Sequence, residues 1–274
     1  MNLKDIFIYG LFHRIISTNR SSRWFGVLTN ARLYKPLLRL FIMAYISFFR
    51  IDMSEYDFDI NTANTFNEFF TRQLKTGVRT WGTGICAPVD GRMLSYGPIQ
   101  NGQIFQVKGK NYSEQELTGQ EKMVSGSFVN LYLSPANYHR VHAPFDMQIN
   151  KVTHIPGKLL SVSKKNAETV DNLYSKNERV VLTGTSEFGT FHFVFVGATN
   201  VGSIRLSFDS AFRSNLKNAR LQSFETDQKI ALGKEIGWFE MGSTVIVLIE
   251  SAHLENVKEE FLDEAVNLGK ELVD

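Results

Sequence analysis

Residues 242–249 read Gly-Ser-Thr-Val-Ile-Val-Leu-Ile, and this stretch decides how the remaining sequence is interpreted. The five residues from Val245 to Ile249 are all apolar and mostly β-branched, which is typical of a buried strand. A Gly-Ser pair before such a strand usually forms a tight turn. It can also present a serine whose preceding residue has no side chain, so that the carbonyl of Gly242 is open to attack by the hydroxyl of Ser243.

Outward from this strand, seven further short runs rich in β-branched and aromatic residues are separated by Gly, Asn, Ser and Pro. They span 92–96, 103–108, 127–133, 148–154, 179–183, 191–197 and 202–208. Eight short strands with few long helical patterns between them predict an antiparallel sandwich or barrel-like core rather than a doubly wound parallel sheet.

Helices are expected on both sides of this core in the sequence. Thr65 and Glu68 have the spacing of a capping box and predict a helix that ends near Lys75. Near the C-terminus, apolar residues at spacings of three to four predict an amphipathic closing helix; they are Leu254, Val257, Phe261, Ala265, Leu268 and Leu272. The predicted fold class is therefore α+β, with a helical region in residues 1–75 and a β-rich catalytic core in residues 76–274.

The first fifth of the chain is basic, although the whole chain is nearly neutral. The net charge is +2, yet residues 1–50 carry eight Lys or Arg and one acid, a net charge of +7 that leaves −5 for the rest. The longest run without a charge, 40–49, has roughly half the length of a membrane-spanning helix. Short basic helices with apolar faces, restarted at Pro36, suit the surface of an anionic membrane. Packing of the same helices on the rest of the domain is the alternative.

Composition limits the chemistry that the chain can perform. Hydrophobic residues make up 43% and charged residues 21%, which is ordinary for a globular protein and excludes disordered and collagen-like classes. The single cysteine, Cys86, cannot form an internal disulfide. His139 and His142 have no Cys or His-x-x-Glu partner at the spacing of a zinc site, so no metal is predicted. A cofactor would then be bound from outside or made from the chain itself.

Three motifs carry candidate chemistry. Asp90 lies in a Pro-Val-Asp-Gly turn, where an aspartate usually bonds its own backbone. His139 and His142 lie between two prolines on a loop and are suited to proton transfer, although a packed histidine pair is equally consistent with the pattern. Asp90 and His142 are the residue types that activate a serine such as Ser243, but sequence spacing does not show that the three meet.

Together and in this order, the motifs resemble those of the phosphatidylserine decarboxylases. The matching segments are 65–70, 88–91, 108–112, 133–135, 138–142, 177–180, 196–203, 233–237 and 242–244. The resemblance runs from about residue 51 to residue 249 and extends more loosely through the basic N-terminal segment. Two departures are small: Met241 and Ala143 stand where Leu and Met are usual in that family.

The resemblance implies that the chain cuts itself between Gly242 and Ser243 into a β chain, residues 1–242, and an α chain, residues 243–274. Asp90 would orient His142, and His142 would take the hydroxyl proton of Ser243. Ser243 would then become a covalent pyruvoyl group, the cofactor implied by the family. Such a group forms a Schiff base with phosphatidylserine, and loss of CO₂ gives phosphatidylethanolamine. His139 is the residue expected to assist protonation.

The resemblance also implies the partners and the location. The expected partners are phosphatidylserine in an anionic membrane surface, the chain's own β and α fragments, and a second β/α pair in a homodimer; no nucleic acid is expected. The expected location is peripheral, on the cytoplasmic face of the cell membrane.

Two other functions would use the same residues. A serine hydrolase would direct Asp90, His142 and Ser243 at an external ester or peptide, but the chain has no G-x-S-x-G elbow, and a serine directly before a buried strand is poorly exposed. A lipid-binding module would use the Gly-Ser pair only as a turn.

Overall fold

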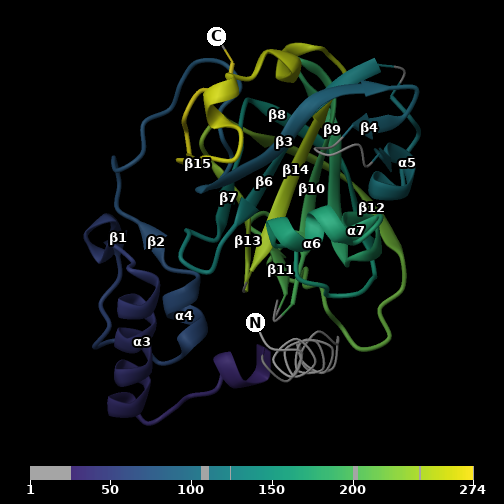
Figure 1. The fold of residues 1–274 in the computed structure, drawn as a ribbon. Coiled ribbons are helices and arrows are strands. Elements are labelled where there is room, and N and C mark those ends of the chain that lie inside the picture. Colours follow the sequence, from purple (N-terminus) through teal and green to yellow (C-terminus); the bar gives the residue numbers. More distant parts are fainter. Residues whose placement is uncertain (1–25, 106–110, 124, 200–202, 241, 274) are drawn as a thin grey trace, which may run out of the picture.

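The centre of the molecule is one strongly curved, half-barrel sheet of ten antiparallel strands (Figure 1). The computed structural model describes residues 26–105, 111–123, 125–199, 203–240 and 242–273. The strand order is β12-β8-β9-β10-β14-β6-β3-β4-β5, with β15 paired to β3. The strands are β3 (Gly91–Gln100), β4 (Gln103–Phe105), β5 (Asn111–Ser113), β6 (Ser125–Leu133), β8 (Met147–Ile155), β9 (Arg179–Ser186), β10 (Gly189–Gly197), β12 (Gln222–Ile230), β14 (Ser243–Ile249) and β15 (Ala265–Val266).

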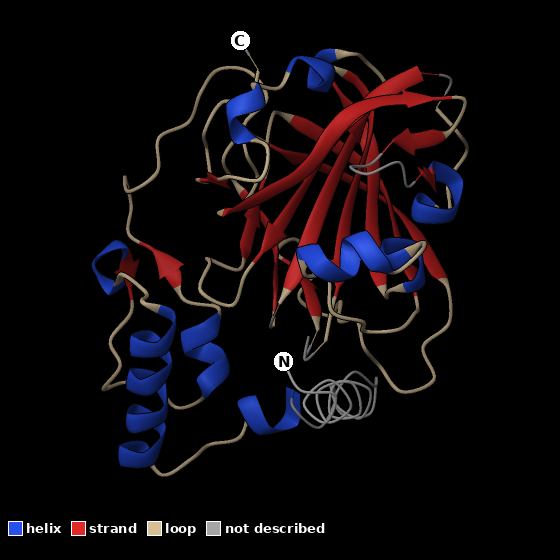
Figure 2. Cartoon of the chain, in the orientation of Figure 1, coloured by secondary structure: helices blue, strands red, loops and turns tan. Residues whose placement is uncertain are grey.

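Two smaller sheets and several short helices surround this sheet, as Figure 2 shows by colour. One small sheet has the order β11 (Ile204–Leu206), β13 (Glu235–Phe239) and β7 (Arg140–His142), and the other pairs β1 (Tyr56–Asp57) with β2 (Gln73–Leu74). The helices are α3 (Lys35–Phe49), α4 (Phe66–Phe70), α5 (Glu114–Thr118), α6 (Lys164–Thr169) and α7 (Leu173–Lys176), with 3₁₀ turns at Met53–Glu55, His253–Asn256 and Glu259–Phe261. Residues 26–29 are also helical.

Strand β14 lies in the middle of the large sheet, and both of its faces are covered. Val245, Val247 and Ile249 belong to one buried apolar cluster, which includes side chains of the β11-β13-β7 sheet and of the C-terminal segment. Ile246 and Leu248 belong to a second cluster, with side chains of α5 and α7. Because successive side chains of a strand point to opposite faces, two covered faces require an apolar residue at every position. The β-rich antiparallel core predicted from the sequence is confirmed.

The capping box predicted at Thr65 and Glu68 is present, but its helix is shorter than expected. The Glu68 N–H donates to Thr65 Oγ1 at 3.1 Å, and the Asn64 N–H donates to Glu68 Oε2 at 2.9 Å. Helix α4 ends at Phe70 instead of continuing to Lys75. The chain turns into β2 because its backbone pairs with β1, and the Lys75 N–H donates to Glu55 O at 2.9 Å.

The predicted C-terminal helix is wrong. The segment folds as two 3₁₀ turns and the short strand β15, with left-handed backbone at Asp263 (φ 63°) and Gly269 (φ 83°), a conformation that an α-helix cannot contain. Its backbone bonds the core directly, for example from the Leu272 N–H to Ile85 O at 2.9 Å. The three-to-four spacing marks residues that are buried, including Leu254 and Leu268, with the exception of the exposed Ala265, but these contacts are made by 3₁₀ turns and extended chain and not by an α-helix.

The N-terminal residues that the structure describes form a small cluster of their own. Helix α3 begins with Pro36 in its first turn, as expected, and Leu38 and Ile42 pack with Phe66 and Phe70 of α4. The helices expected before residue 26 lie outside the described residues. No described helix is long and apolar enough to cross a membrane. The division of the chain at residue 75 stays a prediction.

Candidate active site

Ser243 is the first residue of β14 and lies between two neighbouring strands. It pairs with Leu133, the last residue of β6, and with Gly197, the last residue of β10. Its side chain is completely buried, and its hydroxyl makes no hydrogen bond to the described residues. A buried hydroxyl without a partner is costly, and such groups often mark functional sites. A side chain at Gly242 would meet no atom within 4 Å, so packing does not require a glycine there.

The segment 134–142 carries both histidines, and each of its ends lies beside residues near Ser243. His139 is in the loop before β7, and His142 is the last residue of β7. The segment begins at Ser134, directly after the β6 residue that pairs with Ser243, and ends in β7, which pairs with β13. The Phe239 N–H donates to the His139 carbonyl at 3.0 Å, and Phe239 is three residues before Gly242 in the sequence. A turn fixes the start of the loop, where the Ser134 N–H and Oγ both donate to Asn137 Oδ1, at 2.7 and 2.6 Å.

His139 is fully buried and presents one free ring nitrogen. Its Nδ1 lies 2.8 Å from the Asn137 carbonyl. A carbonyl oxygen can only accept, so the proton is on Nδ1 and the lone pair of the neutral ring is on Nε2. That Nε2 atom has no partner among the described residues. Burial, which includes the ring of Phe70 at 4.2 Å between centroids, lowers the pKa of His139 to about 3, so the ring is neutral at pH 7.

His142 has the same tautomer for the same reason. Its Nδ1 lies 2.8 Å from the carbonyl of Gly233, which is in the connection between β12 and β13. Nε2 therefore carries the lone pair and accepts a hydrogen bond from the Tyr138 hydroxyl at 3.1 Å. Burial lowers the pKa of His142, while the hydrogen bond to Gly233 and the charges of Glu235 and, more weakly, Asp90 act in the opposite direction. His142 is thus a neutral base whose basic nitrogen is shielded by a phenol.

Asp90 lies near His142 but does not hydrogen-bond it. The two segments are joined through the backbone, where the His142 N–H donates to Pro88 O at 2.9 Å. The Asp90 carboxylate accepts from the Arg79 guanidinium at 3.1 and 2.6 Å and from the Leu268 N–H at 2.7 Å. The structure therefore brings the charge of Asp90 close to His142, whereas Gly233 orients the ring. No described hydrogen bond joins Ser243 to either histidine.

Sequence reasoning missed three residues that shape the site. Arg79 bonds both Asp90 and Glu55, with 2.9 Å between Arg79 Nη2 and Glu55 Oε2, and its surroundings in the sequence give no signal of this role. The Tyr138 hydroxyl and the Gly233 carbonyl set the state of His142, and both lie in segments that the family resemblance had already marked. Only their contacts were unpredictable.

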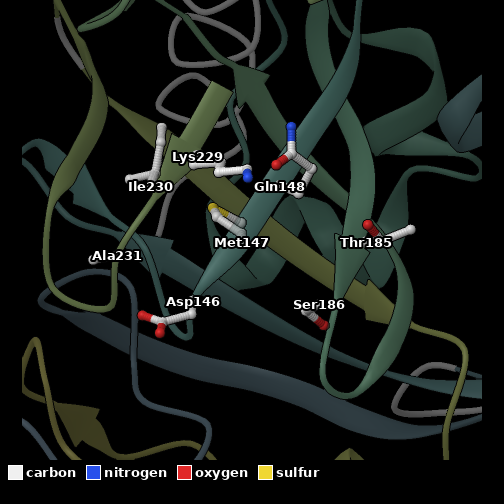
Figure 3. A pocket seen from close by; sticks show the side chains of 8 residues that line it. All are labelled: Asp146, Met147, Gln148, Thr185, Ser186, Lys229, Ile230 and Ala231. Atoms are coloured by element: carbon white, nitrogen blue, oxygen red, sulfur yellow. The ribbon is translucent and has the colours of Figure 1, made fainter. Parts of the chain in front are cut away.

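Neither a metal centre nor the shallow pocket at the start of β8 provides another candidate for the catalytic site. Among the described residues, no three His, Cys, Asp or Glu side chains are placed to hold a metal. Figure 3 shows a shallow pocket where β8 begins and β9 and β12 end, lined by Asp146, Met147, Gln148, Thr185, Ser186, Lys229, Ile230 and Ala231. It lies beside the end of the β9–β10 hairpin opposite to Gly197, a strand length of about 25 Å from Ser243. None of the predicted site residues lines it.

The fold is a β-rich core in which a buried serine and two neutral histidines lie on neighbouring segments, and these are residue types from which catalytic sites are built. A family model described as phosphatidylserine decarboxylase matches residues 66–273. The chain belongs to the phosphatidylserine decarboxylase family, as the motifs predicted, and it is a decarboxylase of the carboxy-lyase class.

Three relatives illustrate the similarity, and each is named phosphatidylserine decarboxylase proenzyme. The protein of Brevibacillus brevis is 38% identical over 261 residues, which is 90% of both chains. That of Variovorax paradoxus is 40% identical over 216 residues, or 76% of both chains. That of Campylobacter jejuni is 35% identical over 269 residues, which covers 94% of this chain and 99% of the relative.

Proposed function

We propose that this chain converts phosphatidylserine to phosphatidylethanolamine and CO₂, after cutting itself between Gly242 and Ser243. The observation that carries this proposal is the buried, unpartnered hydroxyl of Ser243, which follows a glycine at the head of β14 in a member of this family. Relatives named as proenzymes support a processing step. In the uncut chain, complete burial also argues against a hydrolase that uses the intact serine, because an external ester could not reach this hydroxyl before cleavage.

The first step needs a base for the hydroxyl proton of Ser243, and His142 Nε2 carries the required lone pair. The Tyr138 hydroxyl must turn away before this nitrogen can take the proton. The Ser243 oxygen attacks the Gly242 carbonyl carbon, the peptide C–N bond breaks, and the proton passes to the Ser243 nitrogen. An ester has then replaced the peptide bond. The Gly233 carbonyl and the charges of Glu235 and, more weakly, Asp90 stabilise the imidazolium that forms on His142.

The second step releases the β chain. A base removes the Cα proton of Ser243, the Cβ–O bond breaks, and Gly242 leaves as the carboxylate end of residues 1–242. The dehydroalanine that remains takes up one water and releases ammonia, which leaves a pyruvoyl group at the start of residues 243–274. The space beside Gly242, where an added side chain would meet no atom within 4 Å, fits a reaction at this carbonyl.

Decarboxylation then depends on His139. A pyruvoyl group at residue 243, joined to the substrate amine with loss of one water, would supply the acceptor for the electrons left at Cα when CO₂ departs. The carbon must receive a proton afterwards, and His139 Nε2 is a free basic nitrogen on the loop that borders the start of β14. His139 can take the proton from the substrate amine and return it to Cα.

We also propose that the protein lies on the cytoplasmic face of the cell membrane through its N-terminal region. Helix α3 buries only Leu38 and Ile42, while several of its large apolar side chains face solvent. The exposed ones are Leu37 (56%), Leu40 (65%), Phe41 (50%), Met43 (49%) and Phe48 (80%). Together with the basic residues of this region, they suit an anionic bilayer surface. A homodimer of the β/α pair stays a prediction, to be checked by light scattering.

Mass spectrometry of the purified chain tests the proposed function. Two fragments, 1–242 and 243–274, with a pyruvoyl group blocking the new N-terminus are expected, together with CO₂ release from phosphatidylserine. An intact chain with esterase activity would support a hydrolase, and an intact chain that only binds lipid would support a binding module. For the membrane contact, Leu40→Ser with Phe48→Ser should weaken sedimentation with phosphatidylserine vesicles, and unchanged sedimentation would refute it.

A further inference from the structure

An exposed turn lies in the connection between β11 and β12, far from α3 in the sequence. It comprises Leu216-Lys217-Asn218-Ala219-Arg220-Leu221 and is called here the 216–221 turn. Leu216 is 55% exposed and Leu221 is 65% exposed, although both are large apolar residues. Two such side chains at the tip of one short loop are not accounted for by the catalytic site or by the core.

The base of this turn is firmly anchored. The Asn215 N–H donates to Glu178 Oε1 at 2.7 Å, and the same oxygen lies 2.8 Å from His154 Nε2. Glu178 and His154 are both buried. Ser214 is buried as well, and its Oγ accepts from the Ile204 N–H at 2.9 Å. The two leucines are therefore exposed on a loop whose base is fixed in the core.

The charges of the 216–221 turn fit an anionic surface. Lys217 and Arg220 are exposed, and neither has an acidic partner among the described residues. Each end of the turn has a leucine next to a cation, Leu216 with Lys217 and Leu221 with Arg220, so that apolar groups and positive charges reach solvent together. This is the combination that binds an anionic bilayer, where leucines enter between the headgroups and cations pair with phosphates and carboxylates.

The position of the 216–221 turn points to the same partner. Arg213, near the turn, forms an ion pair with Glu240 at 3.3 Å, and Glu240 is three residues before Ser243 in the sequence. The Glu240 N–H donates to Ser203 O at 2.8 Å. At the other side, Tyr45 of α3 donates to Pro135 O at 2.9 Å, on the loop that follows β6. In Figure 1, α3 and the β11–β12 connection both lie at the lower end of the molecule.

We propose that the 216–221 turn is a second contact with the anionic lipid surface, so that α3 and this turn together hold the start of β14 toward the bilayer. This inference rests on the proposed function, because it deepens how the same site meets a lipid substrate. Two separate contacts fix the orientation of the molecule, whereas one helix alone would leave it free to rotate about that helix. Binding through both contacts also raises the overall affinity by making the second contact intramolecular.

Two double variants of the full chain test the proposal. Lys217→Gln with Arg220→Gln should lower affinity for vesicles of phosphatidylcholine and phosphatidylserine by about thirtyfold at low salt, from about 1 kcal/mol for each cation. Leu216→Ser with Leu221→Ser should lower it by about tenfold, and this loss should persist at high salt. The matched controls are Lys229→Gln, at the far end of β12, and Leu262→Ser, an exposed leucine in the C-terminal segment.

The measurements distinguish an effect of the 216–221 turn on vesicle binding from an effect on catalysis. Vesicle affinity is measured by sedimentation, and decarboxylation is measured on vesicles and on a short-chain phosphatidylserine dissolved as monomers. The expected result is weaker vesicle binding with normal self-cleavage and an unchanged rate on the dissolved substrate. Unchanged vesicle binding, or an equal loss on dissolved substrate, overturns the proposal. If the wild type does not decarboxylate either substrate but its vesicle binding still depends on the turn, the proposed function fails and this inference stands.

Discussion

The hydroxyl groups of Ser243 and Thr244 allow stability and chemistry to be tested separately. Both residues are completely buried, and neither hydroxyl makes a hydrogen bond to the described residues. A buried hydroxyl without a partner costs about 1 to 3 kcal/mol. Ser243→Ala and Thr244→Val remove the hydroxyl with little change of shape, so each substitution is expected to stabilise the folded, uncut chain by about 1 to 2 kcal/mol.

Only one of the two substitutions should stop self-cleavage. Ser243→Ala lacks the nucleophile and should remain one chain, whereas Thr244→Val should still be cut after Gly242. The stability comparison requires uncut chains throughout, so both changes are also made in a His142→Ala background, which blocks cleavage of every protein compared. The expected stabilisation corresponds to a rise in Tm of about 2 to 8 °C.

Thermal unfolding followed by circular dichroism gives the Tm values, and mass spectrometry gives the state of the chain. A lower Tm for Ser243→Ala in the His142→Ala background would mean that the hydroxyl has a stabilising partner in the folded chain, and the reasoning from an unpartnered group would be refuted. Loss of cleavage in Thr244→Val would show that both hydroxyls take part in the chemistry.

Three further predictions follow from buried charge and from the space beside the cleaved bond. Burial raises the pKa of Glu114 from 4.5 to about 7. The folded chain therefore binds a proton more readily than the unfolded chain, and it loses stability as the pH rises through that range. Glu114→Gln should be more stable than the wild type above pH 7, by up to about 3 kcal/mol in urea unfolding, with no such gain at pH 4. Arg79→Gln should lower the free energy of unfolding by about 3 kcal/mol, because it leaves the buried Asp90 carboxylate without its cation. Glu55 lies at the 38% exposed end of the same network, so Glu55→Gln should lower it by less than about 1 kcal/mol. Equal losses in urea unfolding would contradict this order. Gly242→Ala should leave Tm unchanged, because the added methyl meets no packed atom. It should slow self-cleavage, followed on gels, because the methyl lies next to the carbonyl that Ser243 would attack. A lower Tm would show that the methyl clashes.

The fold was predictable where a strand buries its residues and not where it is exposed. Strand β14 is apolar at every position because both of its faces are covered, and this pattern is visible in the sequence. Strand β12 (Gln222–Ile230) was missed because it lies at the sheet edge with a mostly exposed, polar surface, so no burial pattern marks it. Along 254–272, burial was predicted correctly except at Ala265, which is exposed while Val266 is buried. The backbone was not predicted, because apolar spacing does not distinguish a helix from two 3₁₀ turns and a strand.

The residue types of the site were predictable, whereas their hydrogen-bond partners were not. The Tyr-His-Arg-Val-His segment and the Gly-Ser pair identified His139, His142 and Ser243 as candidates. The state of His142, however, depends on the carbonyl of Gly233, which is 91 residues away in the sequence. Any residue can supply a backbone carbonyl, so no side-chain pattern marks this contact. Asp90 was expected to orient His142, but its carboxylate accepts no hydrogen bond from the imidazole: it accepts from Arg79 and the Leu268 N–H, while His142 Nδ1–H donates to the Gly233 carbonyl.

The N-terminal region packs on the histidine that we propose as the base for decarboxylation. Phe70 of α4 covers the ring of His139, and α4 is in turn covered by α3, whose outer face is apolar and exposed. The same packing that displays α3 to a bilayer therefore excludes water from His139 and keeps its pKa far below neutrality. At pH 7 the ring is neutral, and its Nε2 carries the lone pair that the proposed proton transfer uses. If the proposed function and the proposed membrane contact both hold, membrane attachment and the protonation state of this histidine depend on one set of contacts between α3, α4 and the segment that carries His139.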